Sequence, residues 1–92
     1  QCTHIKALQS DVPPNGESYD VILANINRHI LLQFMQQLSS ILLPDGYLFM
    51  SGFYADENHL LINEASKWGL QLCTSSERQQ WSSLMFQKST AA

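Results

Sequence analysis

Residues 19–53 have the sequence YDVILANINRHILLQFMQQLSSILLPDGYLFMSGF. Within residues 19–25, Val, Ile, Leu and Ala follow one another without alternation, a pattern typical of a strand buried on both faces of a sheet. Within residues 27–43, apolar residues recur at the three- and four-residue steps of one helix face, with glutamines opposite. We therefore predict a buried strand followed directly by an amphipathic helix.

A turn and a second buried strand follow the predicted helix. The Pro-Asp-Gly run at residues 44–46 ends the helix with turn chemistry, and residues 47–51 form another apolar strand that stops at Gly52. Asp56 is suited to cap a second helix, and Gly69 is suited to the left-handed position that ends it. The order strand, helix, strand, helix predicts a parallel sheet with right-handed crossovers.

Shorter strands are predicted on both sides of this unit. Residues 5–8 form a strand candidate, and the Pro-Pro-Asn-Gly run at residues 13–16 predicts a loop after it. Residues 70–75 and 81–87 predict two more strands, and the polar stretch 76–80 between them is too short for a parallel crossover. These last two strands must run antiparallel if they pair, which adds a reversed strand to a mostly parallel α/β sheet.

The composition limits the possible functions of the chain. Its 92 residues make at most one small domain, and 45% hydrophobic with 14% charged residues is typical of a globular protein. The formal charge is −3 and the basic residues are scattered, so the clustered charge that nucleic-acid binding needs is missing. No apolar run reaches the roughly 20 residues of a membrane span. We expect a cytoplasmic protein with neither a nucleic-acid nor a membrane partner.

The cysteines and histidines do not suggest a metal site. Cys2 and Cys73 fall in no metal-ligand spacing and are expected to be free thiols of a reducing compartment. The histidines stand alone, without acidic or cysteine partners at ligand spacing, so no metal is predicted. The chain begins with Gln1 instead of Met, from which we expect a fragment or a processed piece.

Candidate functional residues lie where each predicted strand gives way to its loop, because ligands of open α/β sheets bind beyond the carboxyl ends of the strands. These places are residues 10–11, 24–27 and 51–54. Asn25 is the most informative, since its amide oxygen could accept an N–H of a substrate amine and align the lone pair with an electrophilic methyl group. An alternative role for Asn25 is to cap the following helix, although Asn27 could also do so.

A family resemblance rests on residues 19–26, 43–48 and 51–53. With the helix between the first two runs, they resemble the second half of the class I methyltransferase family that modifies large-subunit ribosomal protein eleven. The similarity extends from Leu8 to Lys88. It implies an α/β fold, the C-terminal half of a doubly wound Rossmann-like sheet that is mostly parallel with an antiparallel terminal hairpin. It also implies S-adenosylmethionine as methyl donor and transfer to amino groups of a ribosomal protein.

The resemblance implies roles for individual residues. In this family an asparagine side chain and the next carbonyl receive the substrate amine, and Asn25 and the backbone of Ile26 match those positions. Ser10 and Asp11 match the loop after the third strand, which approaches the adenine of the cofactor. A solvated loop carboxylate is the alternative for Asp11.

Other parts of the family pattern are missing from this sequence. No Gly-x-Gly turn occurs, and the acidic residue that would hold the ribose and the N-terminal recognition domain are also absent. We therefore expect residues 1–92 to be a partial methyltransferase catalytic domain, with an incomplete cofactor pocket and no activity on its own. The strand at residues 5–8 is expected to be displaced or disordered, because the strands that would stand next to it are missing.

Two functions of other classes stay open. The chain could be a non-catalytic α/β interaction module that self-associates into a homo-oligomer through exposed sheet edges. A nucleotide-dependent oxidoreductase of similar topology is disfavoured by the terminal hairpin. Phe53 and Tyr54 either border a methyl-transfer pocket or cover the core, and Trp68 and Trp81 are expected to pack in the core or on the hairpin.

Overall fold

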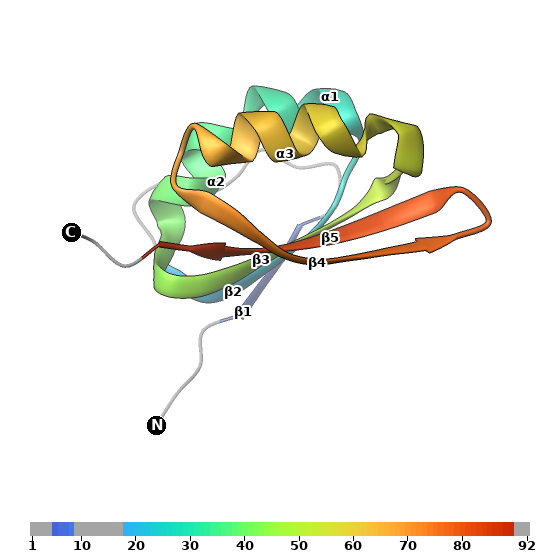
Figure 1. The fold of residues 1–92 in the computed structure, drawn as a ribbon. Helices are drawn as coiled ribbons and strands as arrows, with labels where there is room; N and C mark the ends of the chain where they lie inside the picture. Colours follow the sequence, from blue (N-terminus) through green and yellow to red (C-terminus); the bar gives the residue numbers. More distant parts are fainter. Residues whose placement is uncertain (1–4, 9–17, 90–92) are drawn as a thin grey trace.

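The computed structural model describes residues 5–8 and 18–89, which form one sheet with helices packed against it (Figure 1). The elements in chain order are β1 (Ile5–Leu8), β2 (Tyr19–Asn25), α1 (Arg28–Gln33), α2 (Met35–Ile41), β3 (Leu42–Tyr54), the 3-10 turn η1 (Ala55–Glu57), α3 (Asn58–Ser66), β4 (Leu70–Arg78) and β5 (Trp81–Lys88). None of the helices in these ranges is long and apolar enough to cross a membrane. The predicted loop at residues 13–16 lies outside the described residues.

The strand directions confirm the predicted mixed sheet. The order across the sheet is β1-β2-β3-β5-β4. β1, β2 and β3 are parallel, and β5 is antiparallel to both β3 and β4. The helices α1 and α2 form the crossover between the parallel neighbours β2 and β3, as the alternating sequence pattern predicts.

The strand β1 pairs directly with β2, with Ile5 opposite Val21 and Leu8 opposite Ala24. The family resemblance implies other strands between these two, and of the two alternatives expected for residues 5–8, displacement or disorder, the pairing with β2 fits displacement. Without β1, β2 would leave an edge of unpaired backbone N–H and C=O groups. Pairing with β1 covers this edge over residues 21–24.

The hairpin between β4 and β5 is tighter than predicted. β4 continues to Arg78, so the connection expected over residues 76–80 is reduced to Gln79 and Gln80, whose φ angles are 51° and 74°. Positive φ at both central residues is the type I′ geometry, whose twist matches that of the flanking strands. The predicted boundary was wrong because residues 76–78 are polar and yet pair with β5, as an exposed edge strand allows.

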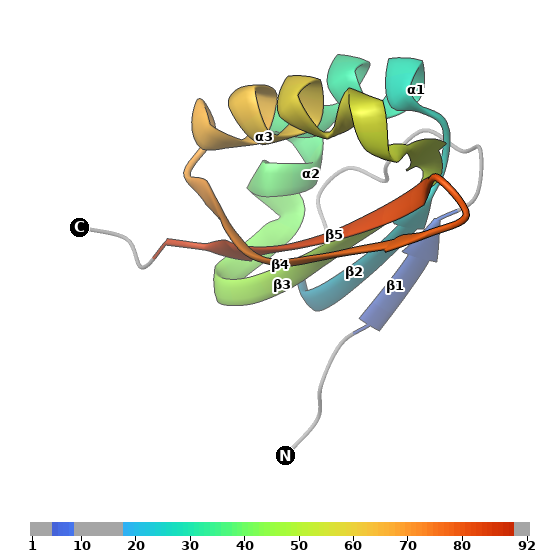
Figure 2. The ribbon, with the colours of Figure 1, turned by 45° about the vertical axis from the view of Figure 1, so that its right-hand side comes forward.

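The single helix predicted over residues 27–43 is two helices in the structure. Phe34 has φ −109° and ψ 15° and separates α1 from α2, which turns toward the start of β3 (Figure 2). The helix ends at Ile41, because Leu42 already pairs with Tyr19 of β2. The Pro-Asp-Gly run at residues 44–46 therefore lies within β3. The prediction that this run ends the helix was wrong.

The predicted cap of the second helix is also wrong. Asp56 lies inside η1, and α3 begins only at Asn58, with Glu57 at the cap position and no side-chain cap hydrogen bond. The chain tightens into a 3-10 turn before the helix starts, which shifts the start beyond Asp56. Gly69 does take the expected left-handed conformation after α3, with φ 77°.

The two faces of the sheet differ. All three helices cover one face (Figure 2), and the core between them and the sheet is completely buried. Its largest side chains include Ile22, Leu31, Leu48, Phe53 and Phe86. The opposite face carries Leu23, Tyr47 and Phe49, which are 42%, 38% and 41% exposed. The prediction that β2 and β3 are buried on both faces therefore holds for one face only, because the described helices all lie on the same side.

Candidate active site

Asn25 lies at the carboxyl end of β2, opposite Ser51 of β3, and its side chain is exposed. The capping role proposed as an alternative belongs to Asn27, whose Oδ1 accepts the backbone N–H of Ile30 at 3.0 Å. Within residues 5–8 and 18–89, the Asn25 amide has no hydrogen-bond partner. The amide is therefore available to a ligand at the end of the strand where open α/β sheets bind ligands.

Gly52 brings the Asn25 side chain and the Ile26 backbone close together. Its φ is 98°, and a Cβ atom added at Gly52 would lie 2.8 Å from Asn25 Oδ1 and 3.2 Å from the Ile26 carbonyl oxygen. Both oxygens thus approach the same point beside Gly52 in β3, and only glycine leaves room for them. The structure brings two hydrogen-bond acceptors together where the sequence predicted an amine-binding pair.

Ile26 can offer only its backbone. Its side chain is 2% exposed and belongs to the hydrophobic core, which fixes the position of its peptide group. A buried side chain next to an exposed asparagine anchors the loop between β2 and α1. Ile26 therefore contributes rigidity as well as a carbonyl.

A shallow pocket of about 340 Å³ borders Asn25 on the exposed face of the sheet. It is lined by Leu23, Ala24, Asn25, Phe49, Ser51 and Ser83. Pockets for cofactors and small ligands usually have a volume of about 300–1,000 Å³, are mostly apolar and contain a few polar groups. This pocket has that character, but its volume is near the low end of the range. The described residues thus fit one border of a cofactor site and do not enclose it.

Glu57 joins the start of α1 to the end of β3. Its Oε2 is 2.6 Å from Nε of Arg28, the first residue of α1, and its Oε1 accepts the backbone N–H of Tyr54 at 3.0 Å. The hydrogen bond from Tyr54, with the charge of Arg28, holds the pKa of Glu57 below its ordinary value. The carboxylate thus stays charged and keeps both contacts at neutral pH.

The aromatic residues after β3 have different environments. Phe53 is 1% exposed and belongs to the core, so it covers the core and does not border the pocket. Tyr54 is 47% exposed and stacks on Trp81, with ring centroids 4.4 Å apart and planes at 24°. Trp81 is therefore a hairpin residue at the carboxyl end of the sheet, whereas Trp68 packs against the core, as predicted.

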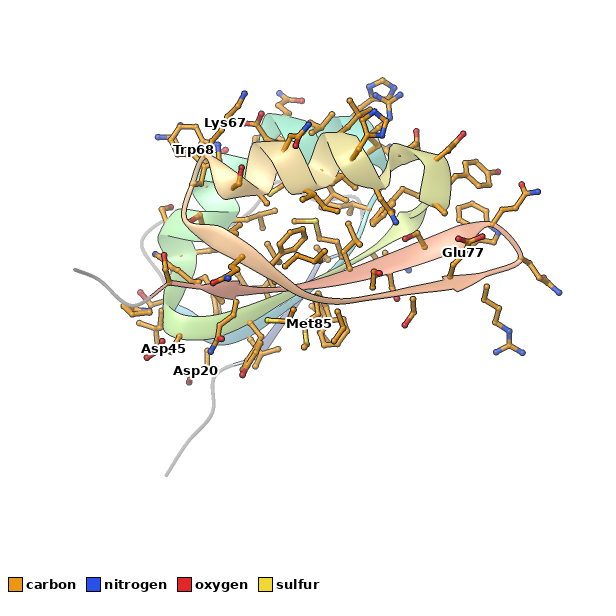
Figure 3. All side chains as sticks on the ribbon, in the orientation of Figure 1. Asp20, Asp45, Lys67, Trp68, Glu77 and Met85 are labelled. Atoms are coloured by element: carbon orange, nitrogen blue, oxygen red, sulfur yellow. The ribbon has the colours of Figure 1, made fainter. Side chains whose placement is uncertain are left out.

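A larger cavity, of about 670 Å³, lies between η1 and the hairpin turn. It is lined by Tyr54, Ala55, Asp56, Glu77 and Gln80, and does not include Asn25. Figure 3 shows Glu77 near the hairpin end, far from Asp20 and Asp45 at the other end of the sheet. Size alone therefore does not select the candidate site, because the smaller pocket holds the free acceptor.

Ser10 and Asp11, the residues predicted to approach the adenine, lie outside the described residues. The Glu57 bridge is a feature that sequence reasoning missed. Arg28 and Glu57 are 29 positions apart, one at the start of α1 and one in η1, and charged residues placed in this way give no periodic signal.

Comparison with known proteins shows the family of this chain. The model of the ribosomal protein L11 methyltransferase (PrmA) family matches residues 1–89. The chain belongs to the ribosomal protein L11 methyltransferase family. A relative from Bacteroides fragilis, a ribosomal protein L11 methyltransferase, is 43% identical over 68 residues, which are 74% of this chain and 24% of the relative. A relative of the same name from Lactococcus lactis is 38% identical over 69 residues, 75% of this chain and 22% of the relative. The chain thus spans about a quarter of the length of these relatives.

Solved structures of methyltransferases share the fold. Ribosomal protein L11 methylase from Lactobacillus delbrueckii subsp. bulgaricus superposes with a TM-score of 0.76 at 25% identity, over 82% of this chain and 39% of that one. The N-methyltransferase NodS from Bradyrhizobium japonicum, in complex with S-adenosyl-L-homocysteine, has a TM-score of 0.61 at 13% identity, over 83% and 49% of the two chains. The predicted family and fold class are confirmed.

Proposed function

We propose that this chain forms part of a protein methyltransferase that transfers methyl groups from S-adenosylmethionine to amino groups of a ribosomal protein. The observation that carries the proposal is the pair of acceptors, Asn25 Oδ1 and the Ile26 carbonyl, that meet at Gly52. Residues 1–92 then form a partial catalytic domain, and the groups that complete the cofactor pocket come from sequence beyond it. Membership of the methyltransferase family supports this assignment.

The two acceptors suit an amine nucleophile. A neutral amine has N–H groups to donate and one lone pair to attack with, so two accepted N–H bonds direct the lone pair away from the acceptors. A lysine amine has a pKa of about 10.4 in water, and loss of solvent around it favours the neutral form. Asn25 and Ile26 would accept from the neutral amine and thus hold its lone pair on one line of approach.

The catalytic contribution of these residues is positioning. S-adenosylmethionine supplies the electrophilic methyl group. Asn25 and Ile26 fix the nitrogen on the line of displacement, and a well-oriented pair of reactants can account for roughly 7–11 kcal/mol of a barrier. The methylated amine carries a positive charge and loses its proton to solvent, because neither an amide oxygen nor a peptide carbonyl is a base at neutral pH.

The cofactor contacts belong to the same proposal. Ser10 and Asp11 would approach the adenine, and the pocket at Leu23, Asn25 and Phe49 would border the methyl end of the cofactor. The isolated chain has no described glycine turn beside this pocket and would be inactive by itself. A ribosomal protein substrate would place the reaction in the cytoplasm.

A non-catalytic interaction module is the second candidate. The observation in its favour is β4, an edge strand in which every residue after Leu70 is exposed. An edge of this kind can pair with the same edge of a second copy. Sedimentation distinguishes the two, because self-association through β4 makes the mass depend on concentration and a monomeric mass at all concentrations excludes it.

The test of the proposed function is a chimera that carries residues 1–92 in place of the matching segment of the Bacteroides fragilis relative. Incubated with S-adenosylmethionine and ribosomal protein L11, it should add methyl groups to amino groups, which mass spectrometry of peptides detects. The unaltered relative is the positive control. A chimera that folds and binds cofactor but transfers no methyl group would overturn the proposal.

A further inference from the structure

Among the described residues, the Glu57 carboxylate joins the start of α1 to the end of β3 through its side-chain contacts, on both sides of the candidate site. Through Oε2 it holds Arg28, which directly follows the helix cap Asn27. Through Oε1 it holds the N–H of Tyr54, two residues beyond Gly52. One side chain thus spans the gap between the end of β2 and the end of β3.

The bridge lies beyond the last pair between β2 and β3, where the sheet no longer holds the start of α1 against the end of β3. The last register pair between β2 and β3 is Asn25 opposite Ser51. Beyond that pair β3 continues beside β5 alone, with Phe53 opposite Ser82 and Tyr54 opposite Trp81, after a register shift at Gly52. Gly52 has φ 98°. Glycine has the widest choice of backbone conformations, and β2 does not pair with β3 beyond Ser51, so another restraint is needed to keep Gly52 against Asn25.

We propose that Glu57 is a positioning residue for methyl transfer, holding the Asn25 amide and the Ile26 carbonyl in register with Gly52. The inference rests on the proposed function, since it assigns to Glu57 the geometry of the amine-receiving pair. Glu57 touches neither of those residues and acts through Arg28 on one side and Tyr54 on the other.

The surroundings of the bridge favour this role. The Arg28 and Glu57 side chains are 28% and 24% exposed, so solvent screens the pair less than it screens a fully exposed one. The Tyr54 ring beyond the bridge stacks on Trp81, and the N–H of Ala55 donates to the Gln80 carbonyl at 2.8 Å. The loop after β3 is therefore tied to the hairpin on one side and to α1 on the other.

The first test is an NMR spectrum of the isotope-labelled chain. Glu57→Gln keeps an acceptor for the Tyr54 N–H and removes the charge that holds Arg28, and Arg28→Gln removes the same ion pair from the other side. Both variants should shift the side-chain amide signals of Asn25 and the backbone signal of Gly52. The double variant should add little to either shift, because both substitutions break one interaction.

Glu64→Gln is the matched control. Glu64 is also an ion-paired carboxylate, 3.3 Å from Lys67 Nζ, but Lys67 and Trp68 lie at the end of α3 away from η1 (Figure 3). The control should leave the Asn25 signals in place. If Glu57 only stabilises the 3-10 turn, Glu57→Gln will lower the melting temperature and leave the Asn25 amide signals unchanged, which overturns the inference.

The second test measures kinetics in the chimera. Glu57→Gln should lower kcat about tenfold with little change in KM for the cofactor, because misplacement of an acceptor by even 1 Å can cost about a hundredfold in rate. Unchanged kcat in Glu57→Gln, together with a strong loss in Asn25→Ala, would refute the positioning role alone. Unchanged kcat in Asn25→Ala would instead remove the proposed function on which it rests.

Discussion

Replacing Gly52 by alanine should damage both stability and the acceptor pair. The added Cβ would lie 2.8 Å from Asn25 Oδ1 and 3.2 Å from the Ile26 carbonyl oxygen, closer than unstrained carbon atoms approach. The left-handed conformation costs an alanine roughly 1–2 kcal/mol, and forcing an atom into a packed contact costs roughly 1–3 kcal/mol. The expected loss of about 2–5 kcal/mol is a large share of the 5–15 kcal/mol by which domains are usually stable.

Gly69→Ala is the control for this prediction. Gly69 also has a positive φ, 77°, but the nearest atom to its added Cβ is the Ser89 Oγ at 3.2 Å, the end of a side chain that can rotate. Gly69→Ala should therefore show the backbone strain, roughly 1–2 kcal/mol, without the collision. Urea unfolding measures both variants, and NMR of the Asn25 amide reports the displacement. If Gly52→Ala costs no more than Gly69→Ala and the Asn25 signals stay in place, the close approach of Asn25 and Ile26 to Gly52 is wrong.

Three further predictions concern the scaffold. Lys88→Met removes the ammonium that donates to the Ser39 and Leu42 carbonyls at 2.7 and 2.8 Å. Urea unfolding should show that the free energy of unfolding falls by about 1.5–3 kcal/mol. An unchanged free energy of unfolding would mean that water replaces the lysine. The double substitution Gln79→Asn/Gln80→Gly places residues that favour positive φ at the two turn positions. It should raise the melting temperature by roughly 4–8 °C for each kcal/mol of stability gained, whereas a lower melting temperature would contradict the type I′ turn. The pKa values of Glu57 and Glu64 are held below 4.5, by the Tyr54 N–H and Arg28 for Glu57 and by the Trp68 indole and Lys67 for Glu64. Their stabilisation is therefore present above about pH 4.5 and lost as the pH falls through the lowered values, so a Glu57→Gln/Glu64→Gln variant should lose less stability between pH 5 and 3 than the unaltered chain.

The sequence was sufficient for the order and direction of the elements, because these depend on local patterns. The apolar runs at β2 and β3 and the short link between β4 and β5 left only a mixed sheet with a terminal antiparallel hairpin. The same patterns could not show the break at Phe34, since this apolar residue has the correct helical spacing whether the helix is continuous or broken. They also could not show that only one face of β2 and β3 is covered, because an apolar run does not say what will pack against it.

The candidate site was only partly accessible from the sequence. Asn25 stood out as an amide at the end of an apolar strand, but the choice between Asn25 and Asn27 as helix cap required the hydrogen bond to Ile30. The approach of Asn25 to Gly52 and the Glu57 bridge depend on contacts between loops 27 or more residues apart, which no local pattern specifies. Ser10 and Asp11 stay predictions.

The most direct test of the account compares the single-turnover rate of methyl transfer in the Asn25→Ala and Asn27→Ala forms of the chimera. Asn25→Ala should slow transfer roughly a hundredfold and leave stability nearly unchanged, by analogy with loss of one group that orients a reacting centre. Asn27→Ala should cost about 1 kcal/mol of stability through the lost helix cap and leave the rate nearly intact. Equal rates for Asn25→Ala and the unaltered chimera would contradict the assignment of Asn25 to the substrate amine.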